Sequence, residues 1–199
     1  MRPALAEDAE AVAELIHVSA AAMLERFAGD RDSSLRVLRA AFRRSGNSAS
    51  GEVAWVAERD GTVAAAMAAF PAGELERRAR RFLRVLLLRT PPWTWRQTLR
   101  LHRLGLEVAP PPPAGTLYVD SLATYERHRR AGAARALLAE AEHLAAERGM
   151  TGVSLETSAG NAEARALYES AGFYVSAKRL PRSGLPGLVA YVKPVRRAP

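Results

Sequence analysis

Two strand-like segments, each followed by a helix-like segment, occupy the chain between residues 116 and 171. The strand-like segments are apolar and short, whereas the helix-like segments repeat apolar residues at spacings of three and four. The strand segments are Thr116–Ala123 and Val153–Thr157, and the helix segments are Gly132–Arg148 and Asn161–Ala171. Strands interleaved with helices predict an α/β layer fold with helices on both faces of one sheet.

The rest of the chain adds strands and helices to this core. We predict strands at Met1–Ala4, Val53–Glu58, Thr62–Phe70, Phe173–Arg179 and Leu188–Lys193, and helices at Glu7–Phe27 and Ser33–Arg44. Arg59-Asp60-Gly61 joins two of these strands and is typical of a hairpin turn. A length of 199 residues suits a single domain, which we place at residues 1–199.

Residues 71–115 interrupt the pattern with two helix-like segments, at about 74–89 and 95–106, and a run of prolines. Two short helices cannot enclose a core, so we interpret this stretch as a helical insertion. Leu75, Phe82 and Leu86 form an apolar stripe that must be covered. We therefore expect the insertion to pack on the domain and border the acceptor site, with Trp93 and Trp95 as pocket or interface aromatics.

Composition excludes several classes of protein. The chain has no cysteine, which rules out disulfides, thiolate zinc sites and a cysteine nucleophile. Its four histidines lack metal-ligand spacing, so we expect no metal site. No apolar run reaches the ~18 residues of a membrane span. We expect a cytoplasmic protein.

The formal net charge of +8 raises the alternative of a nucleic-acid-binding protein that uses the Arg-rich insertion. The helix at 74–89 is too apolar for a solvated groove-reading helix, because it contains Phe82, Leu83, Val85, Leu86, Leu87 and Leu88. We therefore do not expect nucleic acid as a partner. Binding of a highly anionic cofactor is a simpler explanation of the positive charge.

The segment from Leu122 to Ala134 passes from a strand through a short loop into a helix that starts at Gly132. The start of a helix exposes unpaired backbone N–H groups at the positive end of the helix dipole. Small residues at Gly132 and Ala134 allow a phosphate to approach the backbone. Helix packing explains the same small residues equally well.

A second pattern follows about thirty residues later. Asn161, Ala164 and Tyr168 are spaced by three and four residues, so they share one face of a helix. This face carries an amide, a small gap and a phenol. Taken alone, it also fits a capping Asn, a packed Ala and a core Tyr.

Together the two patterns resemble the GNAT N-acetyltransferase superfamily. Arg129-Arg130-Ala131-Gly132-Ala133-Ala134 is similar to its acetyl-CoA signature, Arg/Gln-x-x-Gly-x-Gly/Ala, and residues 161–173 are similar to its signature Asn-x-x-Ala-x-x-Leu-Tyr-x-x-x-Gly-Phe. Arg130 replaces a frequent Gly, which puts the loop path in question, and Ala134 replaces the commoner Gly. The resemblance implies the GNAT fold, a mixed, mostly antiparallel sheet of six to seven strands that splays at the cofactor cleft.

The resemblance also implies site residues. The strand end at Leu122, Ala123 and Thr124 would hold the pantetheine arm of acetyl-CoA. The pyrophosphate would lie on the backbone of Arg129, Arg130, Ala131, Gly132, Ala133, Ala134 and Arg135. Asn161 and Ala164 would line the other side of the cofactor.

The implied reaction is acetyl transfer from acetyl-CoA to a primary amine, of a small molecule or a peptide, by direct attack in a ternary complex. A phenol stays protonated at neutral pH, so Tyr168 is our general acid. Asp120 and Glu156 are our candidates for the base, although carboxylates paired to arginines are an equal alternative. A non-catalytic acyl-CoA sensor is the second alternative, and the oligomeric state stays open, a homodimer included.

Overall fold

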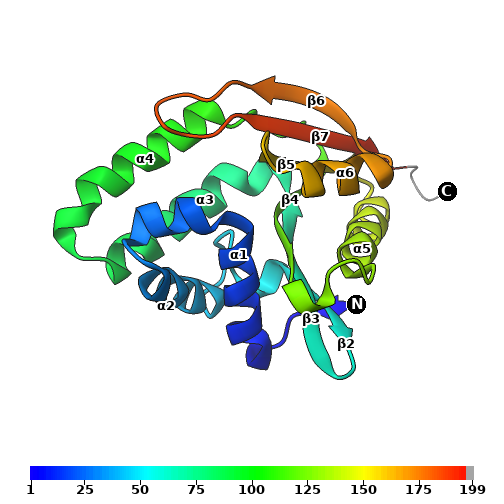
Figure 1. Ribbon diagram of the computed structural model, residues 1–199, viewed down its shortest axis with the longest axis horizontal. Helices are drawn as coiled ribbons and strands as arrows, with labels where there is room; N and C mark the ends of the chain where they lie inside the picture. The colour runs from blue at the N-terminus through cyan, green and yellow to red at the C-terminus, as the bar shows by residue number, and fades with distance from the viewer. Residues whose placement is uncertain (196–199) are drawn as a thin grey trace.

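The computed structural model describes residues 1–195, so the last four residues of the predicted domain, 196–199, lie outside the described residues (Figure 1). In the described part of the chain, seven strands form one sheet in the order β1-β2-β3-β4-β5-β7-β6. They are β1 (Arg2–Pro3), β2 (Ala54–Arg59), β3 (Thr62–Pro71), β4 (Thr116–Thr124), β5 (Gly152–Ser158), β6 (Tyr174–Arg179) and β7 (Leu188–Pro194).

Six α-helices connect these strands within residues 1–195. They are α1 (Ala9–Ala28), α2 (Arg31–Phe42), α3 (Leu75–Arg89), α4 (Trp95–Val108), α5 (Ala133–Glu147) and α6 (Ala162–Ser170). In the sheet, β4 and β5 are parallel and every other neighbouring pair is antiparallel. The predicted α/β fold with a mixed, mostly antiparallel sheet is therefore confirmed.

The helices cover both faces of the sheet. In Figure 1 the sheet is seen nearly on edge, with α1 to α4 on one side and α5 and α6 on the other. The α1 side is closed by a core that joins α1 and α2 to β2 and β3, and it includes Leu15, Leu38 and Val56. On the α5 side, Leu137 and Leu138 pack on Met67 and other side chains of the central strands.

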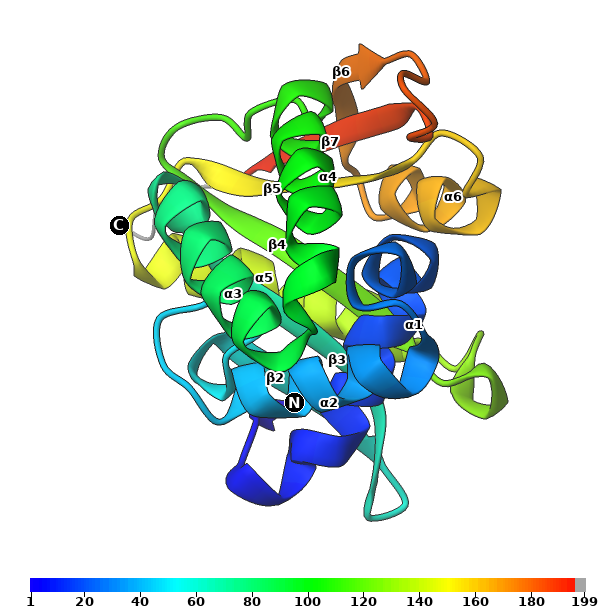
Figure 2. The ribbon, with the colours of Figure 1, turned by 90° about the vertical axis from the view of Figure 1, so that its left-hand side faces the viewer.

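The predicted insertion packs on the α1 side of the sheet. Val85 and Leu86 of α3 are buried in the same core as α1 and α2, and Phe82 packs against it. The hydroxyl of Thr98 in α4 donates to the carbonyl of Phe27 at the end of α1. Figure 2 shows α4 crossing in front of the sheet between α3 and α1. The expectation that the apolar stripe of this segment is covered is confirmed.

Helix α1, predicted at Glu7–Phe27, bends at Ala20, which has φ −144° and ψ 31°. The Ser19 hydroxyl donates to the Ile16 carbonyl just before the bend, a bond that competes with the helical ladder. His17 and Glu25 join the two halves across the bend, with 3.0 Å between Nε2 and Oε1. The second half of α1 thus turns towards α4.

The two central strands separate part-way along their length. Pairing between β4 and β5 runs only from Thr116 opposite Gly152 to Val119 opposite Leu155. Beyond this point β4 continues beside β3, and β5 continues beside β7 as far as Ser158. The predicted splay of the sheet is therefore confirmed.

The start of β5 requires glycine at position 152. A Cβ atom on Gly152 would lie 2.5 Å from the Lys193 carbonyl oxygen and 3.1 Å from the Pro194 Cα atom. Both atoms belong to the backbone of β7, so they cannot move aside without breaking the β5–β7 pairing. A side chain here would displace the strand on which the splay depends.

We predict that Gly152→Ala lowers the free energy of unfolding by about 1–3 kcal/mol through this overlap. Gly105→Ala in α4 is the matched control, because a Cβ there meets no atom within 4 Å. It should raise stability by up to ~1 kcal/mol, since alanine favours the helix. Urea denaturation measures both variants. Equal effects would contradict the close approach of β7.

Candidate active site

A β-bulge at Asp120 lies where β4 and β5 separate. Val119 pairs with Ala69 of β3 and Ser121 pairs with Ala68, so Asp120 is the extra residue between them. A bulge shifts the alternation of side chains by one residue. Before it, Val119 packs with the α5-side core, whereas after it Ala123 packs with the α1-side core.

Glu156 follows the last residue of β5 that pairs with β4. Val153 and Leu155 are buried in the α5-side core. Successive side chains of a strand alternate between faces, so Ser154 and Glu156 face the α1 side. The Ser154 hydroxyl lies 2.7 Å from the Thr116 hydroxyl across the two strands. Glu156 is thus the first side chain on that face beyond the paired region.

The two carboxyl groups have raised pKa values. Desolvation of the carboxyl group raises the pKa of Asp120 from 3.8 to about 7, and a hydrogen bond with Ser121 opposes this shift in part. Burial, and then the charge of Asp120, raise the pKa of Glu156 from 4.5 to about 7. Glu156 is half-buried, whereas Asp120 is exposed to solvent where the strands separate. A base with a pKa near 7 is well suited to proton transfer at neutral pH.

Tyr118 lies close to both carboxylates, and Tyr168 lies close to Tyr118. Tyr118 is buried against Phe70, with 5.8 Å between the ring centroids, and burial raises its pKa. Tyr168 of α6 is also buried, and it packs against Phe173 and Tyr191 at 6.2 and 5.6 Å. Burial and the neighbouring Tyr191 raise the pKa of Tyr168 to about 12, so its phenol keeps its proton.

The Tyr168 hydroxyl has no hydrogen-bond partner among residues 1–195. Its oxygen atom keeps some contact with solvent. Its ring is part of the α5-side core. The alternative interpretation, that Tyr168 is a core residue, is therefore correct for its ring. The free hydroxyl is still able to donate a proton.

The loop before α5 presents an unpaired backbone. Arg130 has φ 59° and Gly132 has φ 85°, so both residues adopt left-handed conformations. No backbone N–H from Arg130 to Arg135 donates a hydrogen bond to another described residue. A Cβ on Gly132 would meet no atom within 4 Å, so there is open space beside the loop at this residue. The loop therefore fits a pyrophosphate.

The predicted cofactor strand also has free polar groups. Leu122, Ala123 and Thr124 pair with β3 on one side and have no strand partner on the other. The Thr124 hydroxyl oxygen is one of two buried side-chain polar atoms in residues 1–195 without a hydrogen-bond partner. A ligand with amide groups, such as a pantetheine arm, would satisfy this edge.

The second predicted segment caps α6. The Asn161 side-chain oxygen accepts a hydrogen bond from the Ala164 N–H at 3.1 Å. The side-chain oxygen of Asn161 thus caps the helix, as the alternative of a capping Asn proposed. The NH₂ group of Asn161 forms no hydrogen bond with the described residues. Arg129 and Glu163 form an ion pair at 3.5 Å, which joins the loop before α5 to α6.

Sequence reasoning missed two features of the site. The bulge at Asp120 has no signature in the local sequence. The left-handed Arg130 costs roughly 1 kcal/mol of backbone strain, which a glycine would avoid. The available signal for this strain was Arg130 in place of the usual Gly. The backbone at Arg130 keeps the positive φ that a glycine adopts easily.

Residues 17–173 match the sequence model of the Acetyltransferase (GNAT) family. The chain belongs to this family. It is an acetyltransferase, as the two signatures predicted. No curated protein matches it in sequence.

Solved structures of the same fold cover almost all of this acetyltransferase. One, called simply an acetyltransferase, has 23% identity, 98% coverage of both chains and a TM-score of 0.70. An N-acetyltransferase from Staphylococcus aureus Mu50 has 18% identity, covers 96% of this chain and 98% of its own, and has a TM-score of 0.70. Ard1 from Thermoplasma volcanium has 18% identity, covers 98% and 97%, and has a TM-score of 0.58. At these identities the similarity supports the fold alone.

No helix in residues 1–195 of the acetyltransferase is long and apolar enough to cross a membrane. In the same part of the chain, no group of three His, Asp or Glu residues is placed to hold a metal ion.

The raised pKa values predict how stability depends on pH. Asp120 and Glu156 bind protons more tightly in the folded chain than in the unfolded chain. The folded state therefore holds more protons between pH ~4 and ~7, and the free energy of unfolding falls as the pH rises through this window. Glu156→Gln should be more stable than the parent at pH 8 by roughly 1–2 kcal/mol, after allowance for solvent screening.

The difference should shrink at pH 5, where Glu156 is protonated in the folded parent. Thermal unfolding at the two pH values measures it. Glu7→Gln is the control, because Glu7 is exposed and forms no ion pair with any described residue. If Glu156→Gln and Glu7→Gln show the same pH dependence, Glu156 has no raised pKa.

Proposed function

We propose that this acetyltransferase transfers the acetyl group of acetyl-CoA to a primary amine of a small molecule or peptide, by direct attack in a ternary complex. The observation that carries the proposal is the end of β4–β5 pairing, which brings free backbone groups and two carboxyl groups with pKa values near 7 to one place. We further propose that the chain forms one domain, with residues 71–115 as its insertion.

Acetyl-CoA is typical of the family, and the residues present fit it. The N–H groups from Arg130 to Arg135 would hold the pyrophosphate, with Arg129 beside them. Leu122, Ala123 and Thr124 would hold the pantetheine arm, and Ala164 and the free Asn161 NH₂ group would border it. When bound, acetyl-CoA supplies an acetyl group activated as a thioester.

Glu156 acts as the base in this proposal. It faces the α1 side of the sheet, opposite to the side of α5 and α6. A neutral amine is needed for attack, whereas about one alkyl amine in 10³ is neutral at pH 7. Glu156 therefore removes the proton from the amine, directly or through water. Burial, and then the charge of Asp120, keep the pKa of Glu156 near neutrality.

Tyr168 acts as the acid. It approaches from the α5 side, so acid and base come from opposite faces of the separated strands. With a pKa of about 12, the phenol carries its proton at neutral pH and donates it to the departing sulfur. The packing against Phe173 and Tyr191 holds the ring in place.

We predict that Tyr168→Phe lowers turnover by ~10²–10⁴ and leaves acetyl-CoA affinity nearly unchanged, because only the proton donor is lost. Gly132→Glu is the paired variant. It would place bulk and negative charge in the open space beside the loop, and should weaken acetyl-CoA binding by at least ~10-fold.

The assay incubates the protein with acetyl-CoA and a panel of small amines, polyamines, aminoglycosides and peptides, and measures the release of free thiol. Calorimetry measures acetyl-CoA binding separately. Acetyl-CoA binding without turnover on any amine would favour the sensor alternative. Normal acetyl-CoA binding by folded Gly132→Glu would overturn the assignment of the loop.

A further inference from the structure

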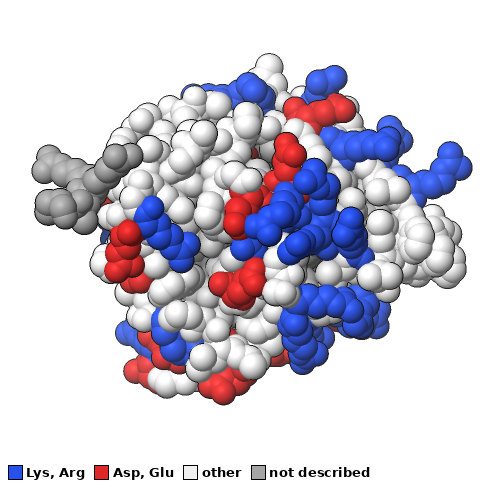
Figure 3. Space-filling view, turned by 180° about the vertical axis from the view of Figure 1, so that it is seen from behind, with Lys and Arg blue, Asp and Glu red and all other residues white. Residues whose placement is uncertain are grey.

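The helical hairpin formed by α3 and α4 concentrates positive charge, because it holds nine of the 29 lysines and arginines of the chain. Residues 77–106 contain nine arginines and no acidic residue. Arg77, Arg78 and Arg80 pair with glutamates. The other six are exposed and form no ion pair with the described residues: Arg81, Arg84, Arg89, Arg96, Arg100 and Arg103. Seen from behind, Lys and Arg side chains gather on the side that holds this hairpin, at the right of Figure 3.

Large apolar side chains are exposed among these arginines. Trp93, at the turn between the helices, is 82% exposed, and Leu88, at the end of α3, is 73% exposed. Trp95, Leu99 and Leu106 of α4 are exposed to a lesser degree. Pro91 and Pro92 start the turn, and the Trp95 ring N–H donates to the Thr90 carbonyl. The tip of the hairpin is thus a firmly built turn that presents a tryptophan and a leucine to solvent.

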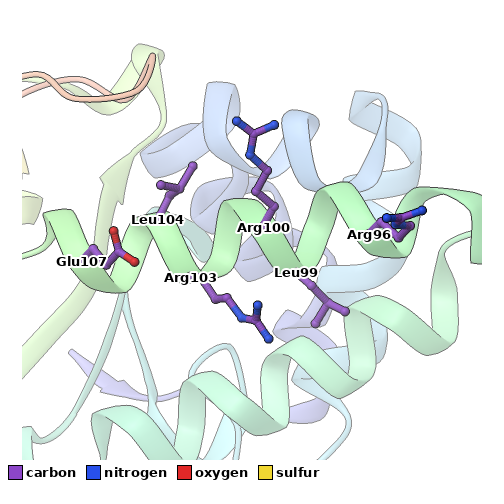
Figure 4. Close-up of a pocket in the computed structure, with 6 residues that line it drawn as sticks. All are labelled: Arg96, Leu99, Arg100, Arg103, Leu104 and Glu107. Carbon is purple, nitrogen blue, oxygen red and sulfur yellow. The ribbon is translucent and has the colours of Figure 1, made fainter.

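A groove on the outer side of α4 combines both kinds of side chain. It has a volume of about 390 Å³, and it is lined by Arg96, Leu99, Arg100, Arg103, Leu104 and Glu107. Leu99 and Arg103 extend towards α3, whereas Arg100 and Leu104 extend to the opposite side of the helix (Figure 4). An anionic head group bound here would meet apolar surface with arginines on both sides of it.

We propose that the α3–α4 hairpin docks on the surface of an anionic lipid bilayer, with the tip of the hairpin in the head-group region. Tryptophan is enriched at this depth of a membrane because its ring is apolar at one end and polar at the other. Basic residues near the surface are attracted to anionic lipids. The hairpin lies on the membrane and does not span it.

Two other occupants fit the surface less well. A nucleic acid would use the arginines, but it would leave Leu88, Leu99 and Leu106 facing its phosphates. A second copy of the chain, docked through the same surface, would bring six unpaired arginines against six more. An anionic bilayer complements both features, because its head groups attract the arginines and its interface accommodates the apolar side chains.

Docking in this orientation leaves the candidate active site free to bind acetyl-CoA. Helices α5 and α6, which border the proposed cofactor site, lie on the opposite side of the sheet from the hairpin (Figure 1). Vesicles should therefore leave the affinity for acetyl-CoA unchanged. Membrane binding and acetyl-CoA binding can therefore be tested independently, so that the failure of one proposal does not imply the failure of the other.

The test is cosedimentation of the full chain with vesicles of phosphatidylcholine alone, or of equal parts phosphatidylcholine and phosphatidylglycerol. We expect binding to the anionic vesicles to be at least ~10-fold tighter. Each arginine near the surface contributes about fivefold. The triple variant Arg96→Gln, Arg100→Gln, Arg103→Gln should thus lose more than ~10-fold in affinity for anionic vesicles. Trp93→Ser should weaken binding several-fold and reduce the blue shift of tryptophan fluorescence.

A matched control removes the same charge elsewhere. The triple variant Arg148→Gln, Lys178→Gln, Arg179→Gln changes exposed residues at the end of α5 and on β6. It should bind anionic vesicles nearly as tightly as the parent. Equal losses in the two triple variants would reduce the effect to net charge and overturn the proposal. The proposal would also be overturned if the parent did not bind anionic vesicles but bound DNA in a salt-sensitive way. The same holds if the parent did not bind anionic vesicles but self-associated, and Trp93→Ser abolished the self-association.

Discussion

The register between β4 and β5 is the constraint on which the rest of the site depends. Four residue pairs join these strands, and the last is Val119 with Leu155. Each strand then follows its other neighbour, so the backbone at the end of β4 loses a partner on one side. The bulge at Asp120 lies at this point, and Glu156 is the next residue of β5. At the other end of the paired region, β7 packs closely on Gly152 of β5.

Much of the fold was predictable from the sequence, because each element has a local signal. The Asp60-Gly61 turn adopts positive φ at both residues, as a two-residue hairpin requires. Asn161 caps α6 as its position suggested. The bend of α1 at Ala20 was not predicted, because it depends on bonds of Ser19, His17 and Glu25 that the apolar periodicity does not encode.

The site was predictable in its residues but not in its geometry. Two signatures pointed to the loop before α5 and to Tyr168, whereas the bulge at Asp120 results from pairing with β3, a contact between distant parts of the chain. The roles of the two faces also emerged only in three dimensions. Burial places Tyr168 with α5, and alternation along β5 places Glu156 on the other face. No spacing in the sequence distinguishes these faces.

Hydrogen exchange with and without acetyl-CoA tests the central claim most directly, because the account rests on backbone N–H groups that lack partners. We predict that saturating acetyl-CoA slows the exchange of amides in the loop from Arg130 to Arg135 and at the end of β4, and leaves α3 and α4 unchanged. Binding of acetyl-CoA without protection of that loop, or with protection centred on the α3–α4 hairpin, would contradict the account.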